Sequence, residues 1–468
     1  MKSLKLLLRF LTVGGLVLLL LIPLTMIRGL IQDRERYRGQ AVERVSQSMA
    51  GPQQLVGPMR VLPWKETRRV NATGSDGRLE LREETVEGYL LQTPATLAAG
   101  GVIEPDVRRI GLYDVRVFQW KADVQAAFAP MPVPAVNGRE YGEPYLVLGL
   151  ADVRGLVGTP SLKADGRALE LQPGTGVLAA RMDGVHAALP APRTGQVVVE
   201  GLPIPPRSLP ASTVDLAMTV AGTQSLGIVP VADSNRIELQ SAWPHPLFSG
   251  RFLPNQRSID TSGFEASWNI SSLASAAQSQ VHDADTARLT MRPGSAGAYT
   301  LPGEADQGVD SVVLSLVDPV DVYTQADRAS KYGILFVVLT FVGFALFELV
   351  KQLRIHPLQY LLVGLALAIF FLLLLGLSEH MAFWKAYLVA AVACIGLQFV
   401  YLSGVLKSWW HAGLFATMLT ALYGALYSLL VSEDNALLMG SLLLFGILAA
   451  IMWITRKVDW YERAATLG

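Results

Sequence analysis

Long apolar runs are the dominant pattern of this chain. About 20 apolar residues in helical form cross a bilayer core, because the helix rises roughly 1.5 Å per residue. Runs near that length occur once close to the N-terminus and five times in the last third of the sequence. They are Phe10–Ile27, Gly333–Leu349, Leu358–Leu377, Ala386–Leu402, Ala412–Val431 and Ala436–Thr455. The pattern predicts an integral membrane α-helical bundle of six transmembrane helices, one N-terminal and five C-terminal.

Basic residues beside these runs predict the orientation. Cytoplasmic flanks of membrane spans carry an excess of Lys and Arg. Such residues precede the first run and fall at alternate ends of the later ones: Lys2, Lys5, Arg9, Lys351, Arg354, Lys407, Arg456 and Lys457. We therefore expect six crossings with both termini in the cytoplasm. Four arginines follow the first run on the opposite side, but long domains translocate largely regardless of charge; they are Arg28, Arg34, Arg36 and Arg38.

A cleaved signal peptide is the alternative for the first run. Signal h-regions usually span about 7–15 residues and end at a small-x-small cleavage site. The run here is longer, and the Met26–Ile31 sequence that closes it contains no Ala-x-Ala. We therefore expect an uncleaved anchor.

The segment between the first and second runs has a different pattern. Tyr37, Ala41 and Val45 recur every four residues, which predicts a helix over Asp33–Met49. Gly51-Pro52 should end that helix, and Gly57-Pro58 should break the chain again.

Short apolar or alternating runs separated by turn residues follow, which predicts a large mainly-β domain of sandwich-like antiparallel sheets. The expected strands include Tyr89–Leu91, Ile110–Trp120, Tyr145–Leu150, Val197–Val199, Thr213–Val220 and Val312–Val317. The expected organisation is a cytoplasmic stub and first span (1–31), a periplasmic β-rich domain (32–332), a five-helix bundle (333–457) and a cytoplasmic tail (458–468).

Charge and composition narrow the function classes. Lys and Arg total 39 and Asp and Glu total 39, so the net charge of zero does not suggest nucleic acid as a partner. The one cysteine, Cys394, lies in an apolar run, so the β domain has no disulfide. The six histidines lack ligand spacing, and we expect neither a metal nor a cofactor.

The β-rich segment contains no Gly-x-Ser-x-Gly elbow, no Ser-x-x-Lys and no glycine-rich phosphate loop. We assign no catalytic residue. An enzymatic activity stays open, but nothing in the sequence indicates one.

Several polar residues at the ends of the apolar runs are candidate functional residues, because ionisable groups in membrane spans are costly and often serve a function. Glu348 lies three residues before Lys351, and an ion pair near the interface is the favoured interpretation. Glu379 and His380 could respond to protons, although an interfacial polar cap is favoured. Gln359, like Gln398, is expected to hydrogen-bond between helices.

The β domain offers two further candidates. Asp152 and Arg154 lie at a strand end, where such a pair most often fixes a turn. Trp243 opens a Trp-Pro-x-Pro segment, which most often packs an irregular edge where proline blocks another strand. Either could instead line a peptide-binding groove.

The combination of these local sequences resembles the CreD family of bacterial inner-membrane proteins, often named cell envelope integrity proteins. The resemblance rests on Asp152-x-Arg154-Gly-Leu, Trp243-Pro-x-Pro-x-Phe-x-Gly, His356-Pro-x-Gln359-Tyr and Ser-Glu379-His380, in this order along the chain. It implies an N-terminal anchor, a periplasmic domain and a helical bundle in the bacterial inner membrane. Leu247 departs from the family pattern, which has serine there; a hydroxyl at that position therefore carries no chemistry here.

The resemblance implies little about mechanism. The family is tied to a two-component regulon that responds to metabolic state, to colicin tolerance and to envelope or β-lactam phenotypes, and no reaction is attached to it. Three hypotheses follow. The first is a non-enzymatic envelope protein whose periplasmic domain binds an envelope component, or a periplasmic or membrane protein partner, while the bundle sits in the lipid bilayer. The second is a transporter or lipid-handling protein, and the third is a membrane sensor that signals to a partner.

Overall fold

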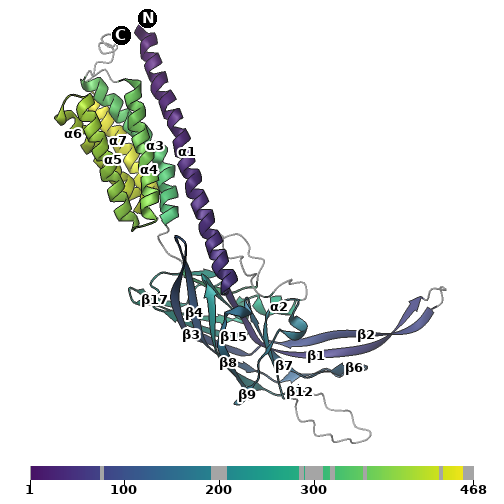
Figure 1. Cartoon of the computed structure of the whole chain (residues 1–468). Helices are drawn as coiled ribbons and strands as arrows, with labels where there is room; N and C mark the ends of the chain where they lie inside the picture. The colour runs from purple at the N-terminus through teal and green to yellow at the C-terminus, as the bar shows by residue number, and fades with distance from the viewer. Residues whose placement is uncertain are drawn as a thin grey trace, which may run out of the picture. The chain divides into compact units, whose positions relative to one another are not determined.

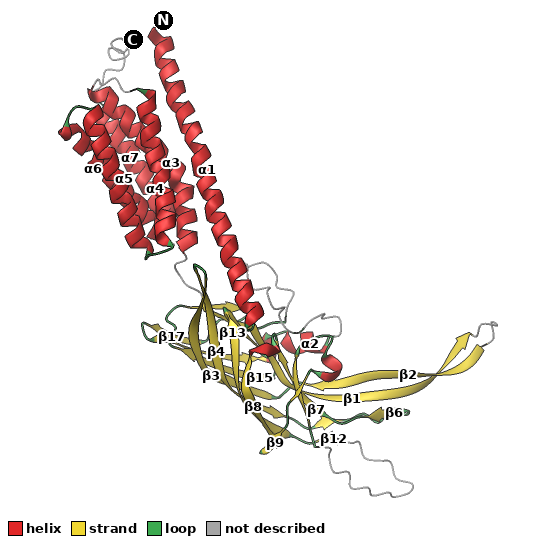
Figure 2. Cartoon of the chain, in the orientation of Figure 1, coloured by secondary structure: helices red, strands yellow, loops and turns green. Residues whose placement is uncertain are grey.

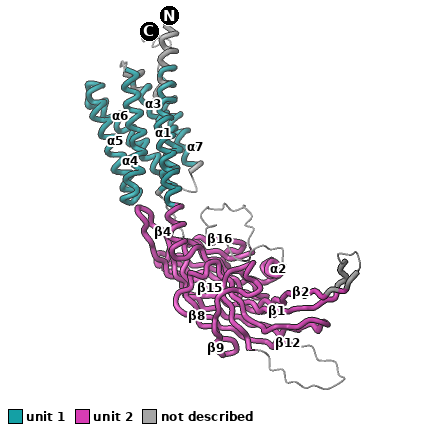
Figure 3. Tube along the Cα trace, turned by 45° about the vertical axis from the view of Figure 1, so that its right-hand side comes forward, with its two compact units in different colours: residues 1–38, 320–468 teal, residues 39–319 magenta. Residues whose placement is uncertain are grey.

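A computed structural model of the protein describes residues 2–73, 79–190, 208–283, 289, 309–316, 322–351, 356–431 and 436–456 (Figure 1). The chain forms two compact units, which Figure 3 colours separately. Unit 1 comprises Met1–Arg38 and Val320–Gly468, and unit 2 comprises Gly39–Pro319. Unit 1 is helical, whereas unit 2 is built mainly from strands (Figure 2).

The helices confirm an integral membrane bundle that accompanies a large mainly-β domain. Five of the described helices, α1 and α3 to α6, are long and apolar enough to cross a membrane, and α7 adds a shorter apolar stretch, Leu438–Trp453. Their bounds are α1 Lys2–Ser48, α3 Val322–Lys351, α4 Pro357–Ser378, α5 Phe383–Val405, α6 Trp409–Val431 and α7 Ala436–Thr455. The short helix α2, Ala277–His282, belongs to unit 2.

Helix α1 joins two elements that the sequence suggested were separate. The expected span Phe10–Ile27 and the expected helix Asp33–Met49 form one helix of 47 residues. Of the five residues between them, Arg28, Leu30 and Gln32 are good helix formers and none is proline, so polarity changes there but the backbone does not break. Within unit 1, α1 buries Leu20, Leu24 and Ile31, whose spacing places them on one helix face.

Close contacts with glycines and aromatic rings hold the bundle together. A Cβ on Gly364 of α4 would lie 2.1 Å from Leu20 Cδ1, so the missing side chain makes room for α1. Phe344 and Tyr360 meet edge-on with their ring centroids 4.7 Å apart. Gln398 is 2% exposed, and neither polar atom of its amide has a hydrogen-bond partner among the described residues, so the bond expected from the sequence does not form.

Unit 2 contains a nine-stranded sheet with β1 at its centre. The order is β10 (Gln172–Pro173), β11 (Gly184–Ala188), β7 (Tyr145–Leu150), β1 (Gln53–Thr73), β14 (Ser225–Val229), β19 (Val312–Leu316) and β16 (Pro246–Gly250), and β2 (Leu79–Gln92) and β6 (Arg139–Tyr141) also pair with β1. All pairings are antiparallel except β1 with β14.

The second sheet has eight strands and is also mostly antiparallel. Its order is β17 (Gln256–Asp260), β18 (Gly263–Ser271), β15 (Ser234–Ser241), β3 (Thr96–Ile110), β4 (Tyr113–Phe128), β13 (Ser212–Thr223), β8 (Leu156–Ala164) and β9 (Arg167–Leu169). Only β15 and β3 pair in parallel. The short strands β5 (Met131–Pro132) and β12 (Ser208–Leu209) pair with each other.

One apolar core lies between the two sheets. Strand β15 alternates exposed and buried residues along its length, as a strand with one buried face does. The core cluster takes Leu55 and Val147 from the nine-stranded sheet and Trp120 and Trp268 from the eight-stranded sheet. The sandwich expected from the sequence is therefore present.

Two local expectations about the strands need correction. Gly57-Pro58 does not break the chain, because β1 continues through it with a register shift between Val56 and Met59, and Gly57 has a φ of 103° that favours glycine. Ile110–Trp120 is not one strand, since a turn separates β3 from β4. The expected strand Val197–Val199 lies outside the described residues.

Candidate functional site

The Asp-x-Arg-Gly sequence lies beside the C-terminal end of α1 in unit 2. Strand β7 ends at Leu150, and a single 3-10 turn, η1 (Val153–Gly155), follows. Asp152 is the N-cap of this turn, where its Oδ1 accepts a hydrogen bond from the Arg154 backbone N–H at 3.1 Å. Short side chains that accept from the first backbone donors are the usual way to start such a turn.

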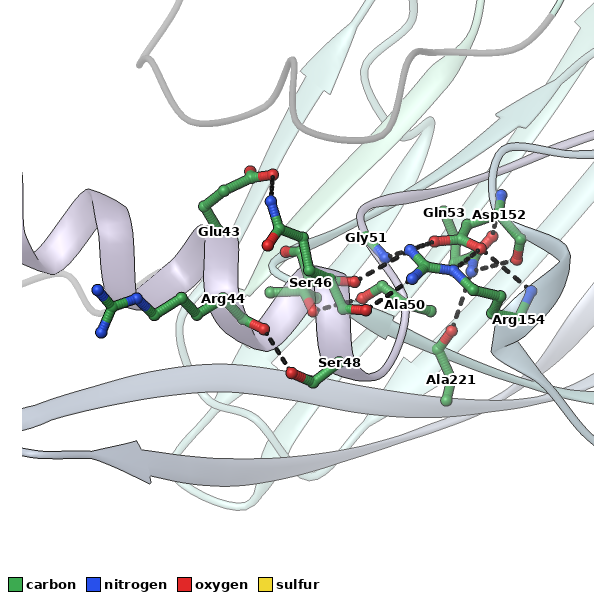
Figure 4. A network of polar contacts seen from close by, with 12 residues as sticks. Glu43, Arg44, Ser46, Ser48, Ala50, Gly51, Gln53, Asp152, Arg154 and Ala221 are labelled. Carbon is green, nitrogen blue, oxygen red and sulfur yellow. Dashed lines mark hydrogen bonds and ion pairs between the residues drawn. The ribbon is translucent and has the colours of Figure 1, made fainter.

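Arg154 holds the end of α1. Its Nε and Nη2 donate to the two carboxylate oxygens of Asp152 at 2.9 and 2.6 Å. Its Nη1 also donates to the Gln47 carbonyl at 2.6 Å, and its Nη2 donates to the Ser46 carbonyl at 3.2 Å (Figure 4). The last carbonyls of a helix have no partner within the helix, so the guanidinium supplies donors that α1 itself lacks.

Gln53 of β1 connects the same turn to strand β13. Its Nε2 donates to the Asp152 carbonyl at 2.9 Å and to the Ala221 carbonyl of β13 at 3.0 Å. A Cβ on Gly155 would lie 2.3 Å from that Ala221 oxygen, so only glycine fits there. We call Gln53, Asp152, Arg154 and Gly155 the helix-end clamp.

Electrostatics favour the charged form of Asp152. The residue is 5% exposed, and burial, the largest single influence, raises the pKa of its carboxyl. The hydrogen bonds from Arg154 and from the Gly51 N–H outweigh burial and hold the pKa below its usual value. Each carboxylate oxygen already accepts two hydrogen bonds, so the geometry suits a fixed ion pair rather than a proton-transferring base.

Trp243 makes a separate set of contacts at the edge of the nine-stranded sheet. Its Nε1 donates to the His245 carbonyl at 2.9 Å, and the two rings meet edge-on with centroids 5.8 Å apart. The Arg116 guanidinium lies 4.1 Å from the centre of the indole ring. Pro246 is the first residue of the edge strand β16. The half-buried indole packs on the core while this loop stays at the surface.

His356 and Gln359 form the start of α4. His356 is the N-cap, and its Nδ1 accepts from the Leu358 N–H at 3.2 Å. The Gln359 Oε1 accepts from the His356 N–H at 3.0 Å, which completes a capping box, and Pro357 occupies the first helical turn. The His-Pro-x-Gln sequence therefore starts a helix, and Gln359 bonds within this cap.

Glu348 contacts a tyrosine of the next helix. The Tyr360 hydroxyl donates to Glu348 Oε2 at 2.8 Å, and Tyr360 is 3% exposed. The expected ion partner, the Lys351 side chain, lies outside the described residues. The carboxylate thus links α3 to α4.

Glu379 joins three helices of unit 1. Its Oε1 lies 3.4 Å from Arg34 Nε of α1 and accepts from the Tyr323 hydroxyl of α3 at 3.5 Å. The neighbouring His380 is exposed, and its Nδ1 lies 3.1 Å from the Gly376 carbonyl of its own helix. The structure therefore brings Glu379 to Arg34 and Tyr323, while His380 contacts the end of α4.

Two of the arginines that follow the first span make contacts between helices that were not expected from the sequence. Arg28 Nε lies 3.7 Å from Asp327 Oδ1 of α3, and Arg34 pairs with Glu379. These pairs fasten α1 to the C-terminal helices. The available signal was only that charges of opposite sign flank the apolar runs. Within the described residues, no group of three or more His, Cys, Asp or Glu side chains could hold a metal ion.

Comparisons with known proteins agree over nearly the full length. The family model described as inner membrane protein CreD matches residues 5–461. The chain is 35% identical over 449 residues to inner membrane protein CreD of Escherichia coli (strain K12), covering 96% of this chain and 92% of that protein. Among solved structures, an M1 zinc metallopeptidase from Deinococcus radiodurans covers 51% of this chain and 52% of its own at a TM-score of 0.22 and 8% identity, too low for an argument.

Proposed function

The chain belongs to the CreD family of inner membrane proteins, and on that premise we propose that it is a non-enzymatic envelope-integrity protein. In this proposal the β domain binds an envelope component or partner protein, and the bundle anchors it in the bilayer. The supporting observation is that the charged candidate residues are engaged in capping or pairing. Asp152 and Arg154 close a helix end, and Glu348 and Glu379 bond to neighbouring helices.

We also propose that both termini lie in the cytoplasm and that unit 2 lies in the periplasm. Helices α5 and α7 run in the same direction if the apolar helices cross alternately, and Lys407 and Arg456 follow their C-terminal ends. Basic residues at these ends, together with those before the first span, fit a cytoplasmic side.

Transport or lipid handling is the second candidate function. The Gln398 amide supports it, because a polar group inside a bundle that lacks a hydrogen bond is costly. Sensing is a weaker third candidate, since the expected cytoplasmic parts are two ends and two short loops, and a signal would have to pass through another membrane protein.

Envelope phenotypes of point variants separate binding from transport. If the β domain carries the function, Glu348→Gln and Glu379→Gln should keep the phenotype of the wild type, because glutamine keeps the size and much of the hydrogen bonding. Trp243→Ala should abolish it by removing a large aromatic contact. The opposite result is loss of the phenotype in both glutamine variants at normal protein abundance, with no effect of Trp243→Ala. It would show that the bundle carries the function.

Protein abundance has to be measured for each variant, because a destabilised domain mimics lost binding. Leu247→Arg supplies the second test, since Leu247, four residues after Trp243, is 48% exposed and contributes little to the core. A normal amount of Leu247→Arg protein with a lost phenotype would support binding at this surface.

A further inference from the structure

Four of the sheet edges in unit 2 are short or interrupted by proline. The nine-stranded order ends in β10, two residues long with Pro173, and in β16, which begins with Pro246. The eight-stranded order ends in β17 and β9, of five and three residues. Open edges invite another strand, and short strands and prolines are common ways of preventing it.

Strand β2 lacks both protections. It has 14 residues and no proline, and in the described part of the chain it pairs with β1 alone. Its pairing runs from Arg60 opposite Gln92 to Thr73 opposite Leu79. On the other side of β1, the last described strand to pair with it is β6, and this pairing ends at Glu66. The ends of β1 and β2 beyond that point form a two-stranded ribbon, the arm, which extends from the sheets of unit 2 (Figures 1 and 2).

The base of the arm is a packed structure. A Cβ on Gly88 of β2 would lie 2.3 Å from the Trp64 ring, so the indole lies flat across the glycine. The Arg139 guanidinium lies over the Trp64 ring, 3.9 Å from the centre of the ring. Arg139 also bonds to Glu66 at 2.5 Å, and Arg68 binds the same carboxylate. These contacts fix the direction in which the ribbon leaves the domain.

The outer part of the arm is exposed and its free strand is acidic. Leu81, Glu83 and Glu84 are exposed there, and so is Glu87 at the base of the arm. Cross-strand ion pairs hold the ribbon together, with Lys65 Nζ 2.6 Å from Glu87 and Arg69 Nε 3.1 Å from Glu83. The sequence of β2 has four glutamates and one arginine, so the strand itself is acidic, and the two β1 cations just named neutralise Glu83 and Glu87.

We propose that the free edge of β2 binds an extended basic segment of a partner protein as an added strand. Every second residue of β2 points its backbone N–H and C=O away from β1. At the inner end the Leu91 carbonyl already lies 3.1 Å from His282 Nε2, so the residues before it give the main-chain hydrogen bonds to a new strand. Lys or Arg side chains on that strand lie across from the glutamates of β2, where opposite charges attract. The inference rests on the proposed partner-binding function and adds to the Trp243 loop a second contact surface for that partner.

The test uses synthetic peptides and the full-length protein in detergent at low salt. The first probe is an alternating Lys-Val peptide about as long as β2, and the second is the same peptide with every other backbone nitrogen methylated. We expect the first to bind and the second to bind at least about tenfold more weakly, because it keeps the charge but cannot pair as a strand. Equal affinity for both would overturn strand addition. This comparison leaves the protein unchanged, so misfolding cannot imitate the result.

A protein variant then tests the charge. Glu84→Lys should weaken the binding of the Lys-Val peptide by about fivefold at low salt and by less at high salt. The matched control is Glu104→Lys, which reverses an exposed glutamate that also faces a cation, Lys121, across a strand pair. An equal effect of both variants would show general charge attraction and would overturn the assignment to β2.

Two further outcomes are informative. The protein alone could form dimers that Glu84→Lys dissociates. That result would show that a second copy of the chain occupies the edge, and it would overturn the proposal. Absence of peptide binding, with a normal phenotype for Glu84→Lys and a lost phenotype for Leu247→Arg, would reject the arm but leave the proposed function standing.

Discussion

Replacing Asp152 by asparagine should loosen the helix-end clamp. Both carboxylate oxygens act only as acceptors there, each for one backbone N–H and one nitrogen of Arg154. An asparagine side chain has one oxygen and one NH₂ group. Whichever way the amide turns, its NH₂ group faces two donors in place of an acceptor.

The size of the effect follows from the two hydrogen bonds that are lost. A hydrogen bond to a charged group contributes about 1.5–3 kcal/mol and a neutral one about 1 kcal/mol. The Arg154 side chain is 51% exposed, so water screens its pair and recovers part of this loss. We expect Asp152→Asn to lower the free energy of unfolding by about 2 kcal/mol, which lowers the melting temperature of a domain of this size by about 3 °C.

Thermal unfolding of residues 32–332, followed by circular dichroism, measures this. Asp123→Asn, at an exposed position of β4, is the control and should leave the melting temperature unchanged. The folded pKa of Asp152 lies below its unfolded value of about 3.9. Its stabilisation is therefore present above that value and is lost as the pH falls through the folded pKa. The difference between wild type and Asp152→Asn should shrink from pH 7 to about pH 3; a constant difference, or none at pH 7, would refute the clamp.

Three other outcomes are expected. A reporter active only in the periplasm, fused after Gly468, should give no signal, and a strong signal would contradict cytoplasmic termini. Residues Gln32–Tyr332 expressed without the spans should give a mainly-β spectrum and a cooperative melt that a reductant leaves unchanged, since this range has no cysteine; a helix-dominated spectrum would contradict an independently folding β domain. Gly364→Ile should lower the thermal stability of the full protein in detergent by about 1–3 kcal/mol, because it collides with Leu20, whereas Gly376→Ile has free space around it and serves as the control.

Local pattern was enough to predict the membrane helices and many strands. Length and hydropathy alone indicate a helix such as Pro357–Ser378, because a bilayer imposes both. The alternation in Thr213–Val220 likewise identified the middle of β13, whose buried residues alternate with exposed ones. In both cases the deciding interaction is between a side chain and its solvent.

Contacts between distant parts of the chain were beyond local pattern. The sequence indicated that Asp152 and Arg154 would pair, but the carbonyls that Arg154 caps lie 107 and 108 residues earlier. For the same reason Gly57-Pro58 suggested a break, whereas β7 pairs with β1 both before and after its bulge and so continues the strand. Of β2 only the apolar end, Tyr89–Leu91, was predicted, because the rest of this strand is polar and shows no apolar alternation.

The pairing of β1 with β14 has a consequence for biogenesis. Gln53 pairs with Leu226, and β14 in turn pairs with β19, whose Val312 precedes the last membrane helices. Hairpins such as β3–β4 join neighbouring residues and can form as soon as they are made, whereas contacts across so many residues must wait for the later strand. Until β14 and β19 have been synthesised, one edge of β1 and its buried side chains stay open to proteases and chaperones. The chain is therefore most vulnerable during synthesis, before its central sheet closes.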